Sequence, residues 1–285
     1  MREIAVVSGK GGTGKTSIVS SLAEVSDTKL VLADCDVDAA NLPLLLSGID
    51  GPAEPFFAGE TACVDDTLCT GCGACEDVCR FGAVRVTDAG TRIDSFHCEG
   101  CHACSLVCPE EAISFQEDQA GTLTVREGPY GTLVHAALGI ARDNSGKLVA
   151  QVRKEARAVA EREARPVILI DGPPGIGCPV HAALSNVDHV LMVTEPSGSG
   201  LHDLERILDL CEHFSLGASC LVNKADLNPA LAEEAMALVT RRGASCLGML
   251  PFDPDVPRAL SRGECPLSVP GFRDRIEEAW ATLTR

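Results

Sequence analysis

The sequence predicts an α/β protein with a doubly wound, mostly parallel β-sheet, interrupted by a small inserted α+β module. Short apolar, β-branched runs alternate with helical patterns along most of the 285 residues, which is typical of a parallel sheet covered by helices. From about residue 54 to 118 this alternation stops and cysteines become frequent. We therefore expect one domain at residues 1–54 and 119–285, with a separate module at 55–118.

Six strands are expected in the larger domain, and helices separate them. The strands are expected at residues 3–7, 29–33, 167–170, 189–194, 219–223 and 245–250. The helices are expected at residues 15–24, 146–163, 180–186, 199–214, 229–241 and 271–284. Ligands of such sheets bind at the carboxyl ends of the strands, so the loops that follow these runs are candidate sites.

Charge and cysteine content exclude several classes of function. The formal net charge is −17, which argues against nucleic-acid partners and anionic lipid, because both require clustered Lys and Arg. Aromatic residues make up only 4%, so no base-stacking surface is expected. No apolar run is long enough to span a membrane, and no signal peptide fits before the first motif, so we expect a cytoplasmic protein. The 15 cysteines are then expected to be reduced.

A glycine-rich loop follows the first expected strand and opens the first expected helix. Residues 9–16 read G-K-G-G-T-G-K-T, and in this context the pattern predicts a phosphate-binding loop rather than a turn without nucleotide. Lys15 is expected to reach the β- and γ-phosphates of ATP, and Thr16 is expected to bind Mg²⁺. The expected ATP- or ADP-binding residues here are Gly9, Lys10, Gly11, Gly12, Thr13, Gly14, Lys15, Thr16 and Ser17.

Two runs of cysteines in the module repeat with a displacement of 29 residues. The first run is Cys69, Cys72, Cys75 and Cys79, and the second is Cys98, Cys101, Cys104 and Cys108. This is the bacterial ferredoxin spacing, in which the fourth cysteine of each run binds the other [4Fe–4S] cluster. The predicted ligand sets are Cys69, Cys72, Cys75 and Cys108 for one cluster and Cys98, Cys101, Cys104 and Cys79 for the other. Structural zinc in the same thiols is the main alternative.

Lys10, a second lysine just after the first glycine of the loop, is typical of the deviant Walker A motif. Here the sequence resembles the MinD/ParA family of ATPases, in the group that includes the nitrogenase iron protein. The resemblance implies that Lys10 reaches the nucleotide of an opposing subunit, so that ATP binding and dimerisation are one event. A solvated lysine on the loop is the alternative.

The resemblance continues through three further segments. Residues 34–42 are similar to the family's D-x-D-x-x-x-x-N-L segment, which implies that Asp36 orients the attacking water and that Asp34 lies near the metal. Residues 167–175 resemble a Walker B strand, which implies that Asp171 holds Mg²⁺. Adenine is expected between Asn223, Pro251 and Asp253; the N-K-x-D pattern at 223–226 alone could indicate guanine. The implied catalytic residues are Lys10, Lys15 and Asp36.

Seven cysteines lie outside the repeat, and most are expected to be small core residues. Cys178 is the exception, because it falls seven residues after Asp171, the offset of a cluster ligand in the nitrogenase iron protein. A metal or redox role at a dimer interface and an inert thiol both stay open for it. His97 and His102 flank cluster ligands and are expected to be surface residues.

Three functions are consistent with these motifs. In the first, nucleotide-dependent dimerisation of an ATP-hydrolysing protein gates electron transfer through two [4Fe–4S] clusters to a partner or metallocluster. In the second, the protein is an ATP-dependent scaffold or carrier in iron–sulfur or heterometal cluster assembly. In the third, it is a positioning ATPase with structural clusters. The expected partners are a second copy or a related subunit, and a redox partner or client protein.

Overall fold

The chain divides into two compact units. The computed structural model describes residues 1–139 and 144–284. The first unit consists of Met1–Glu54, Leu123–Ala137 and Ser145–Arg285, and the second of Pro55–Thr122 and Leu138–Asn144. The segment Pro55–Thr122 of the second unit contains the cysteine-rich part of the chain.

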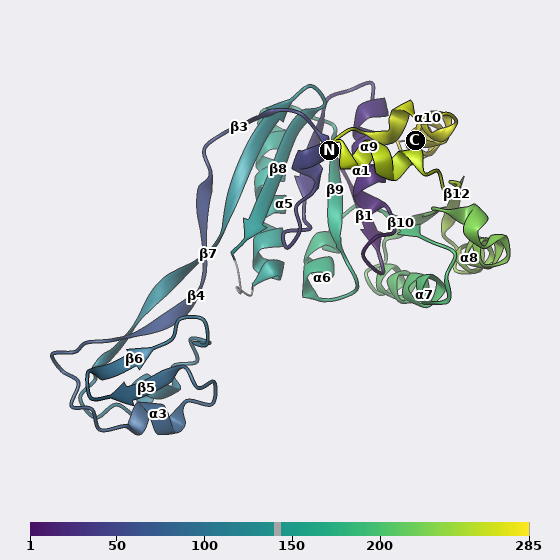
Figure 1. Ribbon diagram of the computed structural model, residues 1–285. Coiled ribbons are helices and arrows are strands. Elements are labelled where there is room, and N and C mark those ends of the chain that lie inside the picture. Colours follow the sequence, from purple (N-terminus) through teal and green to yellow (C-terminus); the bar gives the residue numbers. More distant parts are fainter. Residues whose placement is uncertain (140–143, 285) are drawn as a thin grey trace. The chain divides into compact units, whose positions relative to one another are not determined.

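A mostly parallel sheet forms the centre of the first unit (Figure 1). Its strands lie in the order β12-β11-β10-β1-β9-β2-β8-β7-β3, and every pair from β12 to β8 is parallel, whereas β3 and β7 are antiparallel. The strands are β1 (Arg2–Ser8), β2 (Leu30–Asp34), β3 (Ile49–Asp50), β7 (Ile113–Gly128), β8 (Gly131–Leu138), β9 (Val167–Pro174), β10 (His189–Thr194), β11 (Gly217–Val222) and β12 (Ser245–Met249). The predicted α/β class is confirmed.

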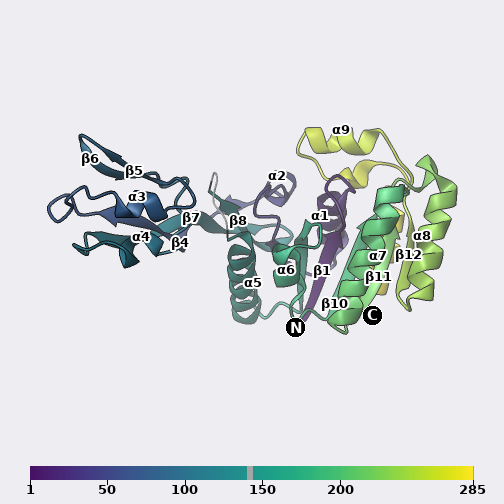
Figure 2. The same ribbon diagram turned by 90° about the horizontal axis from the view of Figure 1, so that it is seen from below.

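Helices cover both faces of this sheet (Figure 2). They are α1 (Lys15–Val25), α2 (Leu42–Leu45), α5 (Ser145–Arg162), α6 (Cys178–Leu184), α7 (Gly198–His213), α8 (Pro229–Arg241), α9 (Asp255–Ser261) and α10 (Phe272–Leu283). One hydrophobic core joins α1 and α10 to the sheet, with Ile4, Leu22, Leu32 and Ile276 fully buried in it. The chain passes from β1 to β2 through α1 in one direction along the sheet, and from β8 to β12 through α5, α6, α7 and α8 in the opposite direction. Because such crossovers are right-handed, the two directions place helices on opposite faces of the sheet.

All six expected strands and all six expected helices are present, with ends within a few residues of the expected ones. The strands β3 and β8 and the short helices α2 and α9 were not predicted. Two 3₁₀ turns, Ala225–Leu227 and Pro266–Ser268, were also missed. These elements are too short or too weakly periodic for a pattern to reveal them.

The second unit is built from short elements around its cysteines. It contains β4 (Glu54–Val64), α3 (Ala74–Val78), the hairpin of β5 (Val84–Thr87) and β6 (Gly90–Ile93), α4 (Ala103–Leu106) and the first part of β7, which pairs with β4. One hydrophobic cluster in it consists of the buried residues Ala62, Cys75, Val84 and Cys104, with Cys79 and Cys98 among the partly buried side chains around it. All 15 cysteines lie in the described part of the chain and all are free thiols.

A buried ion pair connects the beginning of β1 to the helices α5 and α6. Arg153 on α5 lies 2.6 Å from Glu3, and both side chains are less than a tenth exposed. Arg157 also pairs with Glu3, and Arg153 donates to the backbone oxygens of Ala182 and Ser185 at the end of α6. The Glu3 carboxylate therefore pairs with two arginines of α5, and Arg153 connects α5 to the end of α6.

Replacing Glu3 with Ala is expected to lower the free energy of unfolding by about 3–5 kcal/mol, because it leaves Arg153 buried without a counter-charge. Urea denaturation followed by circular dichroism measures the loss. Asp209→Ala is the matched control: it breaks the ion pair of Asp209 with Arg242 on the surface and is expected to cost less than about 1 kcal/mol. Equal losses in the two variants would contradict this account.

Candidate functional site

The glycine-rich loop lies between the end of β1 at Ser8 and the start of α1 at Lys15. Gly12 and Gly14 have positive φ angles of 80° and 93°, which favour glycine. A Cβ on Gly9 would lie 2.1 Å from that of Asp203, and one on Gly14 would lie 2.4 Å from the side-chain nitrogen of Asn223. The loop therefore requires glycine for packing, and it leaves its N–H groups at a helix N-terminus, where phosphate binds.

Two buried carboxylates lie side by side behind this loop. Asp34 at the end of β2 is paired in register with Asp171 on β9, and both are fully buried. Burial and the neighbouring Asp171 raise the pKa of Asp34 well above its usual value. The site is therefore secluded from water, and a cation nearby would favour the ionised form of Asp34.

Lys15 supplies the positive charge in this structure. Its Nζ lies 2.7 Å from Oδ1 of Asp171 and 3.8 Å from Asp36. Burial alone would lower the pKa of Lys15, but the charge and hydrogen bond of Asp171, together with Asp36, raise it. Burial raises the pKa of the half-buried Asp36, against the effect of Lys15. Lys15 therefore stays charged.

The carboxylates leave one oxygen open to a metal ion. Oδ2 of Asp171 is buried and has no hydrogen-bond partner among the described residues, and Thr16 lies in the first turn of α1. Aspartate and hydroxyl oxygens are the ligands Mg²⁺ prefers, so these residues fit a magnesium ion. Asp34 is engaged otherwise: its oxygens accept the backbone N–H groups of Asp36 and Leu42. It thereby also shapes the loop that follows β2.

The expected adenine-binding residues lie at the ends of two neighbouring strands. Asn223 follows β11 and donates to the backbone oxygen of Thr13 at 2.8 Å. Backbone hydrogen bonds between the 222–225 and 250 segments place Pro251 and Asp253 beside it. Asp226, which would recognise guanine in an N-K-x-D site, instead accepts the backbone N–H of Phe252. That engagement favours adenine.

Lys10 is held by its own chain. Its Nζ lies 2.7 Å from Glu195, and it also donates to the hydroxyls of Ser199 at 2.9 Å and Ser197 at 3.2 Å. Glu195 and Ser197 lie on the β10–α7 connection and Ser199 lies in the first turn of α7, almost two hundred residues further along the chain. The sequence singled out none of the three for a role, because only the fold brings them to the loop.

Glu195 also holds a second lysine. Lys224 lies 2.9 Å from Glu195 and donates to the backbone oxygen of Gly12 in the phosphate loop. Burial acts to raise the pKa of Glu195, but its hydrogen bonds to Lys10 and Lys224 lower it. A carboxylate between two lysines thus connects the phosphate loop to α7 and to the end of β11.

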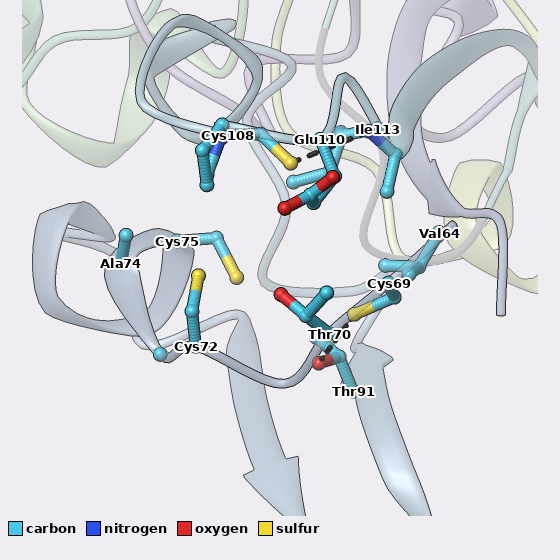
Figure 3. Close-up of a pocket in the computed structure, with 13 residues that line it drawn as sticks. Val64, Cys69, Thr70, Cys72, Ala74, Cys75, Thr91, Cys108, Glu110 and Ile113 are labelled. Carbon is cyan, nitrogen blue, oxygen red and sulfur yellow. Dashed lines mark hydrogen bonds between the residues drawn. The ribbon is translucent and has the colours of Figure 1, made fainter. Parts of the chain in front are cut away.

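Eight of the nine cysteines of the second unit line two cavities. The first is lined by Cys69, Cys72, Cys75 and Cys108. The second is lined by Cys79, Cys98, Cys101 and Cys104. Figure 3 shows the sulfur atoms of the first cavity directed towards a shared space. Each cavity joins three cysteines of one run to the last cysteine of the other run.

Backbone N–H groups point at several of these sulfur atoms. Ala112 donates to Cys108 at 3.3 Å and Ala62 donates to Cys98 at 3.5 Å. Burial acts to raise the pKa of the Cys79 thiol, but backbone N–H groups from residues 81–84 lower it overall. Hydrogen bonds of this kind stabilise thiolates, the form that binds iron. They also tune the reduction potential of a bound cluster.

No group of three or more His, Cys, Asp or Glu side chains within residues 1–139 and 144–284 lies close enough together to hold a single metal ion. The thiolates of a [4Fe–4S] cluster each bind a different iron, so they lie further apart than the ligands of one ion.

His97 and His102 are exposed and pair with Asp94 and Glu60. No helix within the described residues is long and apolar enough to cross a membrane.

The cysteines outside the cavities differ in exposure. Cys35, Cys211 and Cys220 are buried in the first unit, and burial raises the pKa of each thiol. Cys178 is exposed at the first position of α6. A Cβ on Gly146 would lie 3.7 Å from it, so the start of α5 adjoins this thiol.

The sheet order, the glycine-rich loop and the buried carboxylates define a P-loop nucleotide-binding protein. Residues 4–267 match the model of the family described as CobQ/CobB/MinD/ParA nucleotide binding domain, and the chain belongs to that family. It is a P-loop ATPase of the MinD/ParA type.

The chain is similar to proteins of Methanocaldococcus jannaschii. One uncharacterised protein is 32% identical over 262 residues, which cover 91% of this chain and 87% of the relative. A second uncharacterised protein is 28% identical over 287 residues, which cover 98% and 96%. An uncharacterised ATP-binding protein is 25% identical over 266 residues, which cover 91% and 78%.

Similar solved structures include cell-division proteins. The cell division ATPase MinD of Pyrococcus furiosus has a TM-score of 0.57 at 19% identity and covers 99% of this chain and 98% of its own. The MinC:MinD cell division protein complex of Aquifex aeolicus matches with a TM-score of 0.59 at 18% identity, covering 100% and 96%. At these identities the likeness shows the fold alone.

Proposed function

We propose that this ATPase carries a ferredoxin-like module, at residues 55–118, with two [4Fe–4S] clusters, and that nucleotide-dependent dimerisation gates electron transfer through them. This would place it in the nitrogenase-iron-protein-like group of its family. The observation that carries the proposal is the partition of eight cysteines between two cavities, each with three cysteines from one run and one from the other. That crossed partition is the one that two ferredoxin-type clusters require.

The composition of the second unit supports bound clusters. Cys75 and Cys104 are two of the four buried residues in its hydrophobic cluster, and the unit has no disulfide among its described residues. A unit this small buries little apolar surface and needs a cross-link or metal to be stable. Clusters bound to eight thiolates would join β4, α3, α4 and the loops between them. When bound, such clusters carry one electron each at low potential.

In the first unit, the residues of this chain prepare ATP for attack. The loop N–H groups hold the phosphates, Lys15 balances the charge of the β- and γ-phosphates, and Thr16 and Asp171 hold Mg²⁺. Asp36, 3.8 Å from Lys15, is positioned to orient a water molecule. Asn223, Pro251 and Asp253 surround adenine.

Lys10 links this reaction to dimerisation. It lies on the loop and is about a third exposed, so exchanging Glu195 for the phosphates of an opposing subunit's nucleotide needs only a side-chain movement. The partner is a second copy or a related subunit, and closure of the pair would change how the cysteine unit meets a redox partner.

Lys10→Ala is expected to abolish ATP-dependent dimerisation while leaving nucleotide affinity within about threefold of wild type, because Lys15 and the loop N–H groups are unchanged. Light scattering with ADP and with a non-hydrolysable ATP analogue measures the assembly. Lys29→Ala, which removes an exposed lysine remote from the loop, is the control. A Lys10→Ala protein that still dimerises with the analogue would contradict the assignment.

The positioning ATPase with structural clusters is the second candidate, and the similarity to cell division MinD proteins favours it. A third reading is a carrier that loads and releases clusters. Cluster potentials and iron content measured with ADP and with the ATP analogue separate the three. A nucleotide-dependent potential at constant iron supports gated electron transfer. Iron passed to an apo-protein acceptor supports the carrier. The absence of both responses supports the positioning ATPase.

A further inference from the structure

The side chain of Arg126 on β7 donates four hydrogen bonds. Its Nε and Nη2 donate to the two carboxylate oxygens of Asp50 on β3, at 2.6 and 2.8 Å. Its Nη1 donates to the backbone oxygens of Pro43 and of Leu46, the latter at 3.2 Å. The hydrogen bonds to Arg126, ahead of those to His135, lower the pKa of Asp50 to about 2. One side chain therefore holds β3 and α2 together.

Residues 34–41, here called the switch segment, lead from the nucleotide site into the helix α2. Asp34, beside Asp171, accepts the backbone N–H of Leu42 at 3.1 Å, and Leu42 is the first residue of α2 and fully buried. The chain therefore runs from Asp34 through Asp36 into α2, whose carbonyl oxygens bind Arg126. A shift of this segment, when nucleotide and metal occupy the site, has to move α2 against Arg126 or carry Arg126 with it.

The strand that carries Arg126 also leads into the cysteine unit. β7 runs from Ile113 to Gly128; its residues up to Thr122 belong to the second unit and those from Leu123 to the first. It begins just after Ala112, whose N–H donates to the sulfur of Cys108. A single strand, with continuous β-structure, thus has Arg126 near one end and a cavity cysteine beside the other.

The chain that follows α2 packs closely against β7 around Arg126. A Cβ on Gly48 would lie 2.7 Å from Cγ of Arg126 and 2.6 Å from the backbone oxygen of Glu127. Gly51 donates its backbone N–H to Val125 at 2.8 Å. Residues 46–51 are therefore pressed against β7 on either side of the Arg126 side chain.

We propose that Arg126 is a positioning residue that couples the nucleotide-dependent position of α2 to β7, and through β7 to the cysteines of the second unit. This inference rests on the proposed function, because it takes the second unit to be the part that responds to nucleotide. A purely structural role would need only the pair with Asp50, which anchors β3. The coupling role needs the bonds to the carbonyl oxygens of Pro43 and Leu46.

The two roles are separated by a pair of variants in the full, cluster-loaded chain. Arg126→Gln removes both sets of bonds, whereas Asp50→Asn removes the ion pair and leaves the carbonyl bonds. We expect both to retain wild-type iron content and ATP-analogue affinity. We expect Arg126→Gln to lose most of the potential difference between the ADP and analogue states, and Asp50→Asn to keep most of it. Arg92→Gln, at an exposed ion pair with Asp66 on the second unit, is the control.

Hydrogen–deuterium exchange at residues 113–122 is the second readout, and it does not depend on the clusters being redox-active. Analogue-dependent protection in the wild type that Arg126→Gln abolishes and Asp50→Asn preserves supports the proposal. Protection that is equal in wild type and Arg126→Gln, or that is lost equally in both variants, overturns it, as does absence of any analogue effect on these amides in the wild type. Absence of a nucleotide-dependent potential, with the exchange effect intact, overturns the gated electron transfer and leaves the coupling standing.

Discussion

The Cys72→Ala/Cys108→Ala double variant, purified without oxygen, is expected to hold about four iron atoms per chain, half of what two [4Fe–4S] clusters contain. Both residues line the first cavity, so the variant loses two ligands of one cluster and none of the other. Cys72→Ala/Cys79→Ala removes one ligand from each cavity. It is expected to hold clearly less than four iron atoms, because neither set of thiolates is complete.

This pair of variants tests how the cysteines are shared and not merely whether they bind iron. If each run of four held its own cluster, the order would reverse, and Cys72→Ala/Cys79→Ala would keep the larger iron content. Iron and acid-labile sulfide assays on both proteins give the answer. Cys63→Ala is the control from the same unit, since Cys63 lines neither cavity, and it is expected to keep about eight iron atoms. Cys178→Ala, assayed alongside, decides between a redox thiol and an inert one.

Lys15→Met is expected to reduce kcat for ATP hydrolysis by at least about 10²–10³-fold, because it removes a preorganised charge from the phosphate site. The same substitution leaves Asp171 buried without the Lys15 ammonium that pairs with it. We therefore expect the nucleotide-free variant to be less stable than wild type by about 3–5 kcal/mol, with part of that loss recovered when Mg²⁺ is added.

Steady-state phosphate release measures the first effect, and urea denaturation with and without Mg²⁺ measures the second. Lys224→Met serves as the matched control: Lys224 touches the same loop at Gly12 but pairs with Glu195 rather than with the buried carboxylates. It is expected to change kcat far less. A Lys15→Met protein that hydrolyses ATP at the wild-type rate would contradict the assignment of the phosphate site.

Much of the first unit could be predicted because its signals are local. The phosphate loop, β1 and α1 are adjacent in sequence, and β2 and β9 contain the continuous apolar runs 30–33 and 167–170. The partition of the cysteines is also local information, since the 29-residue repeat orders the ligands before any fold is known. By contrast, β8 contains only a brief apolar core at Leu133 and Val134, within small and polar residues, and its pairing with β2 becomes visible only in the sheet.

What could not be predicted depends on contacts between distant residues. The partners of Lys10 lie at Glu195, Ser197 and Ser199, and nothing in those residue types indicates that they meet the loop. Arg126 reads as a polar residue of a strand, yet it connects α2 with β3. The end of the cysteine unit was placed at residue 118 because the cysteines and their spacing end before it, whereas β7 continues through that position without a break.

The central claim is that the two cavities of the second unit hold [4Fe–4S] clusters. The most direct test is the iron and sulfide content of the full chain isolated without oxygen, combined with electron paramagnetic resonance after reduction. The account predicts about eight iron and eight sulfide per chain, with signals from two interacting reduced clusters. Protein that binds zinc in place of iron, or that stays folded with no iron in the presence of iron and sulfide, would contradict it.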